Sequence, residues 1–371
     1  MNEKVIYIGL DVDDQNFHGA SIIAATGEII EFKCRPNAKG LINQLQKLKI
    51  KFPELKIKTC YEATYIGFTL QRDLAAQGFA CDVIAPNSIP RMHGNQIKTD
   101  RLDAIKLAQL YASGLLTIIT PPEVEMEKDR DLMRSRQFIL HQLSEVRTHI
   151  QSLLRRNNLH YKSETGSLSH WTRNHLSWLE KKGEESSGSL KANLKLLIQQ
   201  MKWLTHTRSE YDNAIDELAA TEKYKKQVSS LVCYKGIKNI FALVMITEIG
   251  NIKRFKHPRQ LVSWMGMDIR EYSSGGKSNR LGITKHGNRY LRTAFIESNQ
   301  RIFRAKSIGA DLKQRRKDID PELIQIADRC MIRLAKKGSR LLYAGKHTNK
   351  VKVACAREMV GFVWESLNKV A

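Results

Sequence analysis

The sequence of 371 residues contains no apolar run of the ~18–20 residues that a membrane-spanning helix needs. Its first residues, MNEKVIYIGLDVDD, also lack the charged, apolar and small-residue segments of a secretory signal. These two absences argue against a membrane protein and against an exported one. We therefore expect a cytoplasmic protein that has no membrane partner.

Cysteine is scarce and scattered. The six cysteines lie at positions 34, 60, 81, 233, 330 and 355, and no two of them form a C-x-x-C pair. This spacing argues against a disulfide framework and against a zinc knuckle. Free, buried thiols in a reducing compartment are the simplest interpretation.

Acidic residues are few compared with basic ones. The chain has 61 Lys and Arg against 38 Asp and Glu, which gives a formal net charge of +23. Residues 1–120 carry +2, residues 121–300 carry +11 and residues 301–371 carry +10. A balance of this size indicates a nucleic-acid or anionic-membrane partner, and most of the charge lies after residue 120.

Residues 1–120 alternate between strand-like and helix-like patterns. Strands are predicted at 4–12, 55–63 and 79–86, a β-hairpin at 17–35, and helices at 38–51, 67–78 and 98–114. A hairpin followed by strand–helix units is typical of a mixed sheet with helices on its faces. The sequence therefore predicts an α/β domain here.

The strand signal disappears after residue 120. Residues 130–156 and 190–220 show amphipathic helical spacing on either side of a polar connection, which favours a coiled-coil hairpin over residues 121–230. An ordinary helical bundle is the alternative.

Residues 231–371 are predicted to form a compact helical domain. Within it, residues 232–255 resemble a helix-hairpin-helix, whose turn amides can bind a DNA phosphate, although any short helical hairpin has similar glycines.

Four acidic residues begin or end predicted elements of the first domain. Asp11 ends the first strand, Glu62 ends a later strand, and Asp100 and Asp103 stand three apart at the start of a helix. If that helix packs on the sheet, the carboxylates can meet at the carboxyl ends of the strands, where such sheets bind ligands. This set of ligands suits Mg²⁺ or Mn²⁺, which promote phosphoryl displacement. Taken singly, each acid is more often a turn residue or a helix cap.

The segment EYSSGGKSNRLGITKHGNRYLR, residues 271–292, combines bare hydroxyls, glycines and positive charge. Ser273 and Ser274 precede Gly275 and Gly276, whose small size would let the backbone approach a phosphodiester. We interpret the segment as a flexible loop that brings a hydroxyl to a phosphate. A solvated basic turn with capping serines is the alternative. The basic side chains expected to contact nucleic acid are Lys277, Arg280, Lys285, Arg289 and Arg292.

Several motifs together resemble the DEDD transposases of bacterial insertion sequences, a family that includes the Piv-type DNA invertases. In order, they are YIGLDV, CYEAT, IGFTL, VIAPNSIPR, KTDRLDA, WTRNHLSWL, EIGNIKRFKHPRQLVSWMGM, EYSSGGKSNRLGITKHGNRYLR and KVACAREMVGFVW. The resemblance covers nearly the whole chain. It implies a RuvC-like, RNase H-fold domain at 1–120, a coiled-coil segment at 121–230 and a helical transposase domain at 231–371.

The same resemblance implies roles for particular residues. The positions of the four family acids, which hold Mg²⁺ (or Mn²⁺), are matched by Asp11, Glu62, Asp100 and Asp103. Ser274 matches the nucleophilic serine, with Ser273 as a neighbouring rival. The implied partners are donor and target DNA, a structured guide RNA encoded by the element, and further copies of the chain in a dimer or tetramer. The implied location is the bacterial cytoplasm, at the nucleoid.

Two other functions fit the residues. One is a RuvC-like nuclease, in which a metal-activated water attacks the DNA and Ser274 only binds phosphate. The other is a non-catalytic DNA- or RNA-binding protein. All four acids are present, which argues against the non-catalytic protein. With the acidic set present, we interpret Ser274 as the nucleophile and favour a recombinase that cuts and rejoins DNA through a phosphoserine intermediate.

Overall fold

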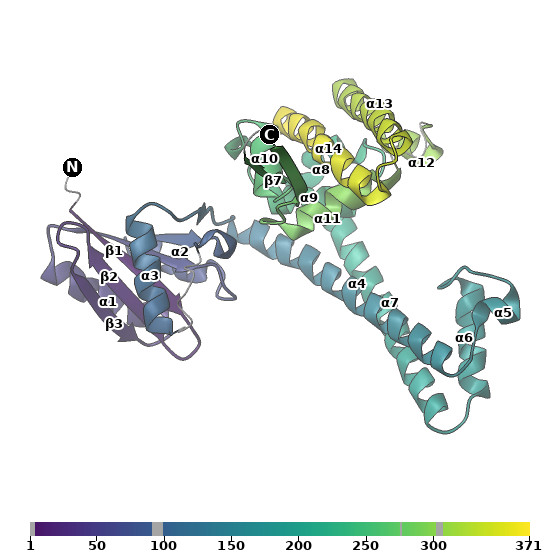
Figure 1. Cartoon of the computed structure of the whole chain (residues 1–371), viewed down its shortest axis with the longest axis horizontal. Coiled ribbons are helices and arrows are strands. Elements are labelled where there is room, and N and C mark those ends of the chain that lie inside the picture. The colour runs from purple at the N-terminus through teal and green to yellow at the C-terminus, as the bar shows by residue number, and fades with distance from the viewer. Residues whose placement is uncertain (1–3, 91–98, 275–276, 302–306) are drawn as a thin grey trace. The chain divides into compact units, whose positions relative to one another are not determined.

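The computed structural model describes residues 4–90, 99–274, 277–301 and 307–371. The chain divides into two compact units, Met1–Pro122 and Glu123–Ala371 (Figure 1). Each unit is described by itself below. The three-part division at residues 120 and 230 stays a prediction.

The first unit is built around one mixed sheet with the strand order β3-β2-β1-β4-β5-β6. β1 pairs in parallel with β4, and β4 with β5, whereas the β1–β2, β2–β3 and β5–β6 pairs are antiparallel. This confirms the predicted mixed α/β sheet and is compatible with an RNase H-like fold. The strands are β1 (Val5–Val12), β2 (Phe17–Ile23), β3 (Ile29–Cys34), β4 (Lys56–Glu62), β5 (Ala80–Ile84) and β6 (Ile118–Ile119).

Helices cover both faces of this sheet. Leu41 and Leu45 from α1 share a core with Ile6 and Ile8 of β1, so α1 lies on the face to which even-numbered β1 residues point. α3 covers the opposite face, where it contacts β1 and β2 (Figure 1). The helices of this unit are α1 (Ala38–Lys51), α2 (Thr69–Ala76), the 3₁₀ turn η1 (Pro86–Ser88) and α3 (Asp100–Ala112).

Two long helices begin the second unit. α4 (Val124–Arg156) and α7 (Gly188–Ala220) lie side by side (Figure 1). Both confirm the predicted helices, and each begins a few residues earlier than predicted. Their facing side chains, including Ile150 of α4 and Leu194 of α7, share a hydrophobic core with the segment that joins the two helices.

The connection between α4 and α7, predicted only as a polar gap, contains helices of its own. It contains α5 (Tyr161–Thr165) and α6 (Arg173–Glu185). α6 buries His175, Trp178 and Leu179, which lie three to four residues apart on one helix face. Charged residues around these three obscured the helical periodicity in the sequence.

The rest of the second unit is a helical bundle around α9, whose residues Leu243, Met245 and Ile246 are almost fully buried. Gly236, with φ of 92°, makes the turn before α9, and Gly250, with φ of 66°, ends it, as predicted. The elements are α8 (Glu222–Val232), α9 (Asn239–Ile249), η2 (Ile252–Arg254), α10 (Pro258–Trp264), α11 (Arg289–Ser298), η3 (Asn299–Arg301), α12 (Ala310–Arg315), α13 (Pro321–Tyr343) and α14 (Thr348–Val370).

This bundle also carries two strands that were not predicted. β7 (Ile269–Ser274) and β8 (Lys277–Ile283) form an antiparallel hairpin where the sequence indicated a flexible loop. Two residues join the strands, which is the shortest common hairpin connection and the one in which glycine is favoured. We call residues 269–283 the serine hairpin.

All six cysteines are buried free thiols. Burial raises their pKa values, that of Cys81 to about 12, so the reactive thiolate is disfavoured at neutral pH. Among the helices that the structure describes, none combines the length and the apolar character needed to cross a bilayer.

Candidate active site

Asp11 and Glu62 end two neighbouring parallel strands on the same face of the sheet. A Cβ atom on Gly9 would lie 2.4 Å from backbone atoms of α3, so odd-numbered β1 residues, Asp11 among them, point to the α3 face. Gly9 pairs with Cys60 of β4, and Cys60 packs against α3 residues. Glu62, two residues further along β4, therefore points to the same face.

The first turn of α3 lies toward the same end of β1. Tyr7 packs edge-on against Tyr111, with ring centroids 5.3 Å apart, whereas Gly9 lies against Ala104 and Ala108. α3 therefore runs antiparallel to β1, and its first turn, which carries Asp100 and Asp103, lies near the carboxyl end of the strand.

Both helix acids continue the sheet-facing stripe of α3. Asp100 is one turn before Ala104, and Asp103 is one turn before Leu107. The helix begins after Thr99, whose hydroxyl accepts a hydrogen bond of 3.3 Å from the Leu102 amide. This local cap fixes where the turn that carries the two acids begins.

His18 lies between a strand acid and a helix acid. It is the register partner of Asp11 on β2, and its Nε2 is 4.0 Å from an Asp100 carboxylate oxygen. The next helix residue is also tied to the sheet: Arg101 forms two hydrogen bonds with Glu31 of β3, one of them 2.7 Å long, and lowers the pKa of that carboxyl. These contacts hold the first turn of α3 over the sheet.

The backbone thus brings the four predicted acids to one edge of the sheet. In the parts of the chain that the structure describes, however, no three His, Cys, Asp or Glu side chains form a group that could hold a metal ion. Whether the four carboxylates act as metal ligands stays a prediction. The donor chemistry fits, since all four are hard oxygen ligands from adjoining elements.

Ser274 is the last residue of β7, at the tip of the serine hairpin. It pairs with Lys277, the first residue of β8, and only Gly275 and Gly276 separate the two. Those two glycines, and the side chains of Ser274 and Lys277, lie outside the described residues. The backbone alone therefore places the predicted nucleophile at the tip of the hairpin.

Ser273 is the neighbouring residue on the same strand. Its hydroxyl donates a hydrogen bond of 2.7 Å to the Glu271 carboxylate, whose other oxygen is 3.4 Å from the Arg280 guanidinium. This carboxylate therefore joins the Ser273 hydroxyl to the second strand of the hairpin.

The other basic residues predicted to contact nucleic acid follow the hairpin tip. Arg280 and Lys285 are exposed. Arg289 is also exposed, and its guanidinium lies over the Tyr290 ring, 5.0 Å from the centroid. Arg292 differs, because its guanidinium donates to the carbonyls of Met265 and Gly287 at 2.8 and 2.9 Å. The structure therefore gives Arg292 a role in holding the base of the hairpin.

That base is closely packed. A Cβ atom on Gly266 would lie 2.4 Å from the carbonyl oxygen of His286, and one on Gly287 would lie 2.3 Å from that of Trp264. Both glycines have positive φ, 70° and 146°. Only glycine fits where these two backbone segments meet, so the segment entering the hairpin and the one leaving it are held together.

A buried carboxylate then anchors the segment that leaves the hairpin. Glu248 on α9 is 1% exposed, and both of its oxygens accept hydrogen bonds from Arg134 of α4, at 2.8 and 3.0 Å. The side-chain Nδ2 of Asn288 donates a third bond of 2.6 Å to Glu248, and its Oδ1 caps α11 by accepting from the Leu291 backbone amide. We call Glu248, Arg134 and Asn288 the hairpin anchor.

The hairpin anchor was not found from the sequence. The available signal was an acid in the otherwise apolar stretch FALVMITEIG, because a charge on a buried helix needs a paired partner. The identity of that partner, an arginine 114 residues away in sequence, could not be read from the pattern.

Comparison with known families gives matches in both units. A family model for IS110-type DEDD elements, described as a transposase, matches residues 8–158, which include all four acids. A second model, described as "Transposase IS116/IS110/IS902 family", matches residues 229–314, which include the serine hairpin and the hairpin anchor residues Glu248 and Asn288. Together the two matches cover more than half of the chain.

Similar proteins cover most of the chain's length. A putative transposase, y4qE, from Sinorhizobium fredii is 28% identical over 96% of this chain and 87% of its own length. The transposase for insertion sequence element IS1533 from Leptospira borgpetersenii is 27% identical over 90% of this chain and 96% of its own length. The transposase for element IS1111A from Coxiella burnetii is 24% identical over 65% of each chain.

Proposed function

Because the chain belongs to the IS110-type family of DEDD transposases, we propose that it cuts and rejoins DNA strands through a phosphoserine intermediate on Ser274. The family makes it an enzyme that acts on DNA. One observation carries the finer proposal. The chain combines four carboxylate positions at one edge of a sheet with a serine at the tip of a basic hairpin.

In this proposal, the first unit is a RuvC-like catalytic domain with an RNase H-like fold. Mg²⁺, or Mn²⁺ in its place, would be held by Asp11, Glu62, Asp100 and Asp103. When bound, the metal would act as a Lewis acid on the phosphodiester and favour the deprotonated serine. The support is the donor set itself, since oxygen ligands on adjoining strands and one helix turn suit such cations.

Ser274 would act as the nucleophile. Its Oγ attacks the phosphorus, one P–O bond of the DNA backbone breaks, and the released DNA hydroxyl takes the proton that the serine loses. The reverse attack by a DNA hydroxyl on the phosphoserine rejoins strands without an external energy source. The position supports this, because Ser274 directly precedes two glycines and pairs with Lys277.

The hairpin anchor would position the serine. Glu248 connects α4 and α9 to Asn288, which begins α11 directly after the hairpin's exit. Exposed Arg280, Lys285 and Arg289 would neutralise DNA phosphates on either side of the attacked one. Arg292 would contribute mainly by holding the hairpin's base.

Two further partners belong to the proposal. One is a structured RNA encoded by the same element, which would pair with donor and target DNA. The other is a second copy of the chain, in a dimer or tetramer, so that the acids of one copy act with the serine of another. The excess of positive charge after residue 120, +11 and +10 in its two parts, supports a large nucleic-acid partner.

Recombination between two DNA circles, one carrying the gene with its flanking DNA and the other random target DNA, tests the proposed function. The full-length protein and Mg²⁺ are expected to join the circles only when RNA transcribed from the flanking DNA is added. Joining without RNA would remove the guide from the proposal. Failure to join under every RNA condition, with a folded protein, would contradict the recombinase itself.

A further inference from the structure

Trp171 is held in an unusual backbone conformation outside the candidate active site. It immediately precedes the cap of α6, and its φ of 65° is in the left-handed region that non-glycine residues rarely adopt. Its amide donates a hydrogen bond of 3.2 Å to Nδ1 of His175, a fully buried residue. Strained backbone that the surroundings hold in place is found preferentially at functional sites.

His175 fixes the Trp171 position in one protonation state. Burial, together with the nearby His170, lowers the pKa of His175 to about 4, so the imidazole is neutral at pH 7. Because Nδ1 accepts from Trp171, the proton is on Nε2, which is buried with no hydrogen-bond partner among the described residues. The His175 ring also packs edge-on against the Trp171 indole, with centroids 5.0 Å apart.

A cation without a counter-ion lies beside this indole. The Arg147 guanidinium on α4 is 5.1 Å from the centre of the Trp171 ring, in a cation–π contact. Among the described residues, no carboxylate forms an ion pair with Arg147, and its Nε is buried and unpaired. Burial lowers the pKa of Arg147, and the like charge of Arg208 on α7 adds to this lowering.

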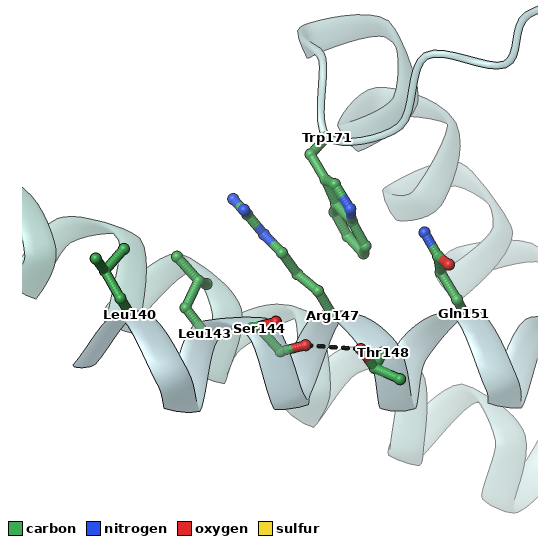
Figure 2. A pocket seen from close by; sticks show the side chains of 7 residues that line it. All are labelled: Leu140, Leu143, Ser144, Arg147, Thr148, Gln151 and Trp171. Atoms are coloured by element: carbon green, nitrogen blue, oxygen red, sulfur yellow. Dashed lines mark hydrogen bonds between the residues drawn. The ribbon is translucent and has the colours of Figure 1, made fainter. Parts of the chain in front are cut away.

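Trp171 and Arg147 line a hollow of about 350 Å³ on α4. Figure 2 shows the indole above α4, with Arg147 on one side of it and Gln151 on the other. Ser144 and Thr148 add hydroxyl groups to the same helix face. The hollow therefore offers an aromatic face, an unpaired cation and several hydrogen-bonding groups, at the lower end of the usual size range for ligand sites.

Two further hollows adjoin it. One shares Ser144 and Thr148, and the other shares Gln151 and extends to Arg155 and Lys162. Residues 139–208, which contain all three, hold 11 Lys and Arg against 5 Asp and Glu, a net charge of +6. Glu145 lines one of the hollows, but the segment as a whole is basic, and three adjoining hollows extend over more than one nucleotide, which favours a polynucleotide over a free small molecule.

We propose that the Trp171–Arg147 hollow binds an unstacked nucleotide of a single-stranded nucleic acid, with the base on the indole and the phosphate at Arg147. An aromatic face takes any base by stacking, and an arginine without a counter-ion takes the phosphate. The bases of intact duplex DNA are already stacked, so the ligand is a single-stranded segment of RNA or DNA. The site goes beyond the proposed recombination chemistry and needs no covalent step.

The test uses the full-length protein with three probes of one mixed 12-nucleotide sequence: single-stranded RNA, single-stranded DNA and duplex DNA. Trp171→Ala should weaken binding of at least one single-stranded probe about tenfold or more, and Trp171→Phe should retain most of the affinity. The single-stranded probe that shows the loss identifies the source of the nucleotide. Binding of duplex DNA should change less than twofold, roughly the scatter of such measurements.

Controls separate the site from general effects. Trp203→Ala removes an indole that is 60% exposed on α7 and lies outside the hollow, so it should leave all three affinities unchanged. Arg147→Gln should weaken the same probe as Trp171→Ala and lower the salt dependence of its binding, with Arg147→Lys restoring part of both. All variants are compared by binding alone, without Mg²⁺ and without a recombination step, so that failure of the serine chemistry is recognised separately.

A crosslinking experiment locates the contact directly. A single 4-thiouridine in the RNA probe, or 4-thiothymidine in the DNA probe, should crosslink on irradiation to the peptide that carries Trp171. The proposal is overturned if Trp171→Ala leaves both single-stranded affinities unchanged, if Trp203→Ala causes an equal loss, or if crosslinks map only to peptides outside residues 139–208.

Discussion

The two halves of the candidate active site are held in different ways. In the first unit, the acids sit on a sheet covered by α3, and the contact at Gly9 is so close that no side chain fits. In the second unit, Ser274 is at the tip of a two-stranded hairpin that is anchored at its base by Gly266, Gly287 and the hairpin anchor. The elements that carry the acids are held mainly by packing, whereas the base of the hairpin is held by glycine packing together with the buried charges and hydrogen bonds of the hairpin anchor.

The charge follows the same division. The first 120 residues are nearly neutral at +2, although they carry the acids, whereas the rest carries the positive charge that nucleic acid requires. Under the proposed function, the first unit supplies metal chemistry and the second supplies binding and the nucleophile. Substitutions in the two units should therefore damage different steps.

The largest effect is expected from Asp11→Asn. It removes one proposed metal ligand but keeps the size of the side chain, so strand cleavage should fall about 10³-fold or more while DNA binding persists. Cleavage of labelled DNA with Mg²⁺ measures this. Asp73→Asn, which removes an exposed acid of the same unit, is the matched control. Cleavage by Asp11→Asn at the parental rate would show that the acids hold no catalytic metal.

Next in size is the effect of Glu248→Gln on the second unit. It leaves Arg134 facing an uncharged amide in a buried site, so the unfolding free energy should fall by about 3 kcal/mol. All five tryptophans lie in this unit, so urea unfolding followed by tryptophan fluorescence reports it alone. Glu222→Gln, at a pair in which Glu222 is 93% exposed, should change it by less than about 0.5 kcal/mol. If the two variants lowered the unfolding free energy equally, the hairpin anchor would not be a stabilising interaction.

Equivalent glycine substitutions in the two units sharpen the contrast. Gly9→Ala forces α3 away from the sheet and should cost about 2–3 kcal/mol. Gly282→Ala in β8 meets no atom within 4 Å and should be nearly neutral or slightly stabilising. Circular dichroism should show the Gly9 loss, while the tryptophan transition stays in place. A similar loss for both variants would mean that the hairpin is packed as closely as the sheet.

The smallest effect concerns a single phosphate contact. Lys285→Gln should make the slope of log K against log salt for duplex DNA less negative by about 0.9, the contribution of one neutralised phosphate. Lys39→Gln, at an exposed lysine of α1, should leave the slope unchanged. Fluorescence anisotropy over a salt series measures both. A larger change for Lys39→Gln would place DNA binding on the first unit.

The acid half of the site could largely be predicted from the sequence. Runs rich in strand-forming residues located β1 and β4, and the acids at the ends of those runs were visible as local features. The packing of α3 against Gly9 could not be predicted, because it depends on a contact between residues about 95 positions apart in sequence. That contact is what brings Asp100 and Asp103 to the strand ends.

The serine half was predicted less well. β7 and β8 are exposed and polar over most of their length, so they show no apolar alternation and resembled a loop. The hairpin anchor and the Arg147–Trp171 contact both join residues from separate helices or loops. Their single members look like ordinary charged or aromatic residues in the sequence, and only the fold shows that they meet.

The most direct test of the central claim is to trap the protein–DNA link. Full-length protein, labelled DNA, Mg²⁺ and the flanking RNA are incubated, denatured and separated, and the labelled peptide is mapped. A covalent adduct on Ser274 is predicted, lost in Ser274→Ala and kept at least in part in Ser273→Ala, whose hydroxyl already bonds Glu271. Strand cleavage at the parental rate in the Ser273→Ala, Ser274→Ala double variant, with no adduct, would contradict the serine mechanism and establish a water-driven nuclease instead.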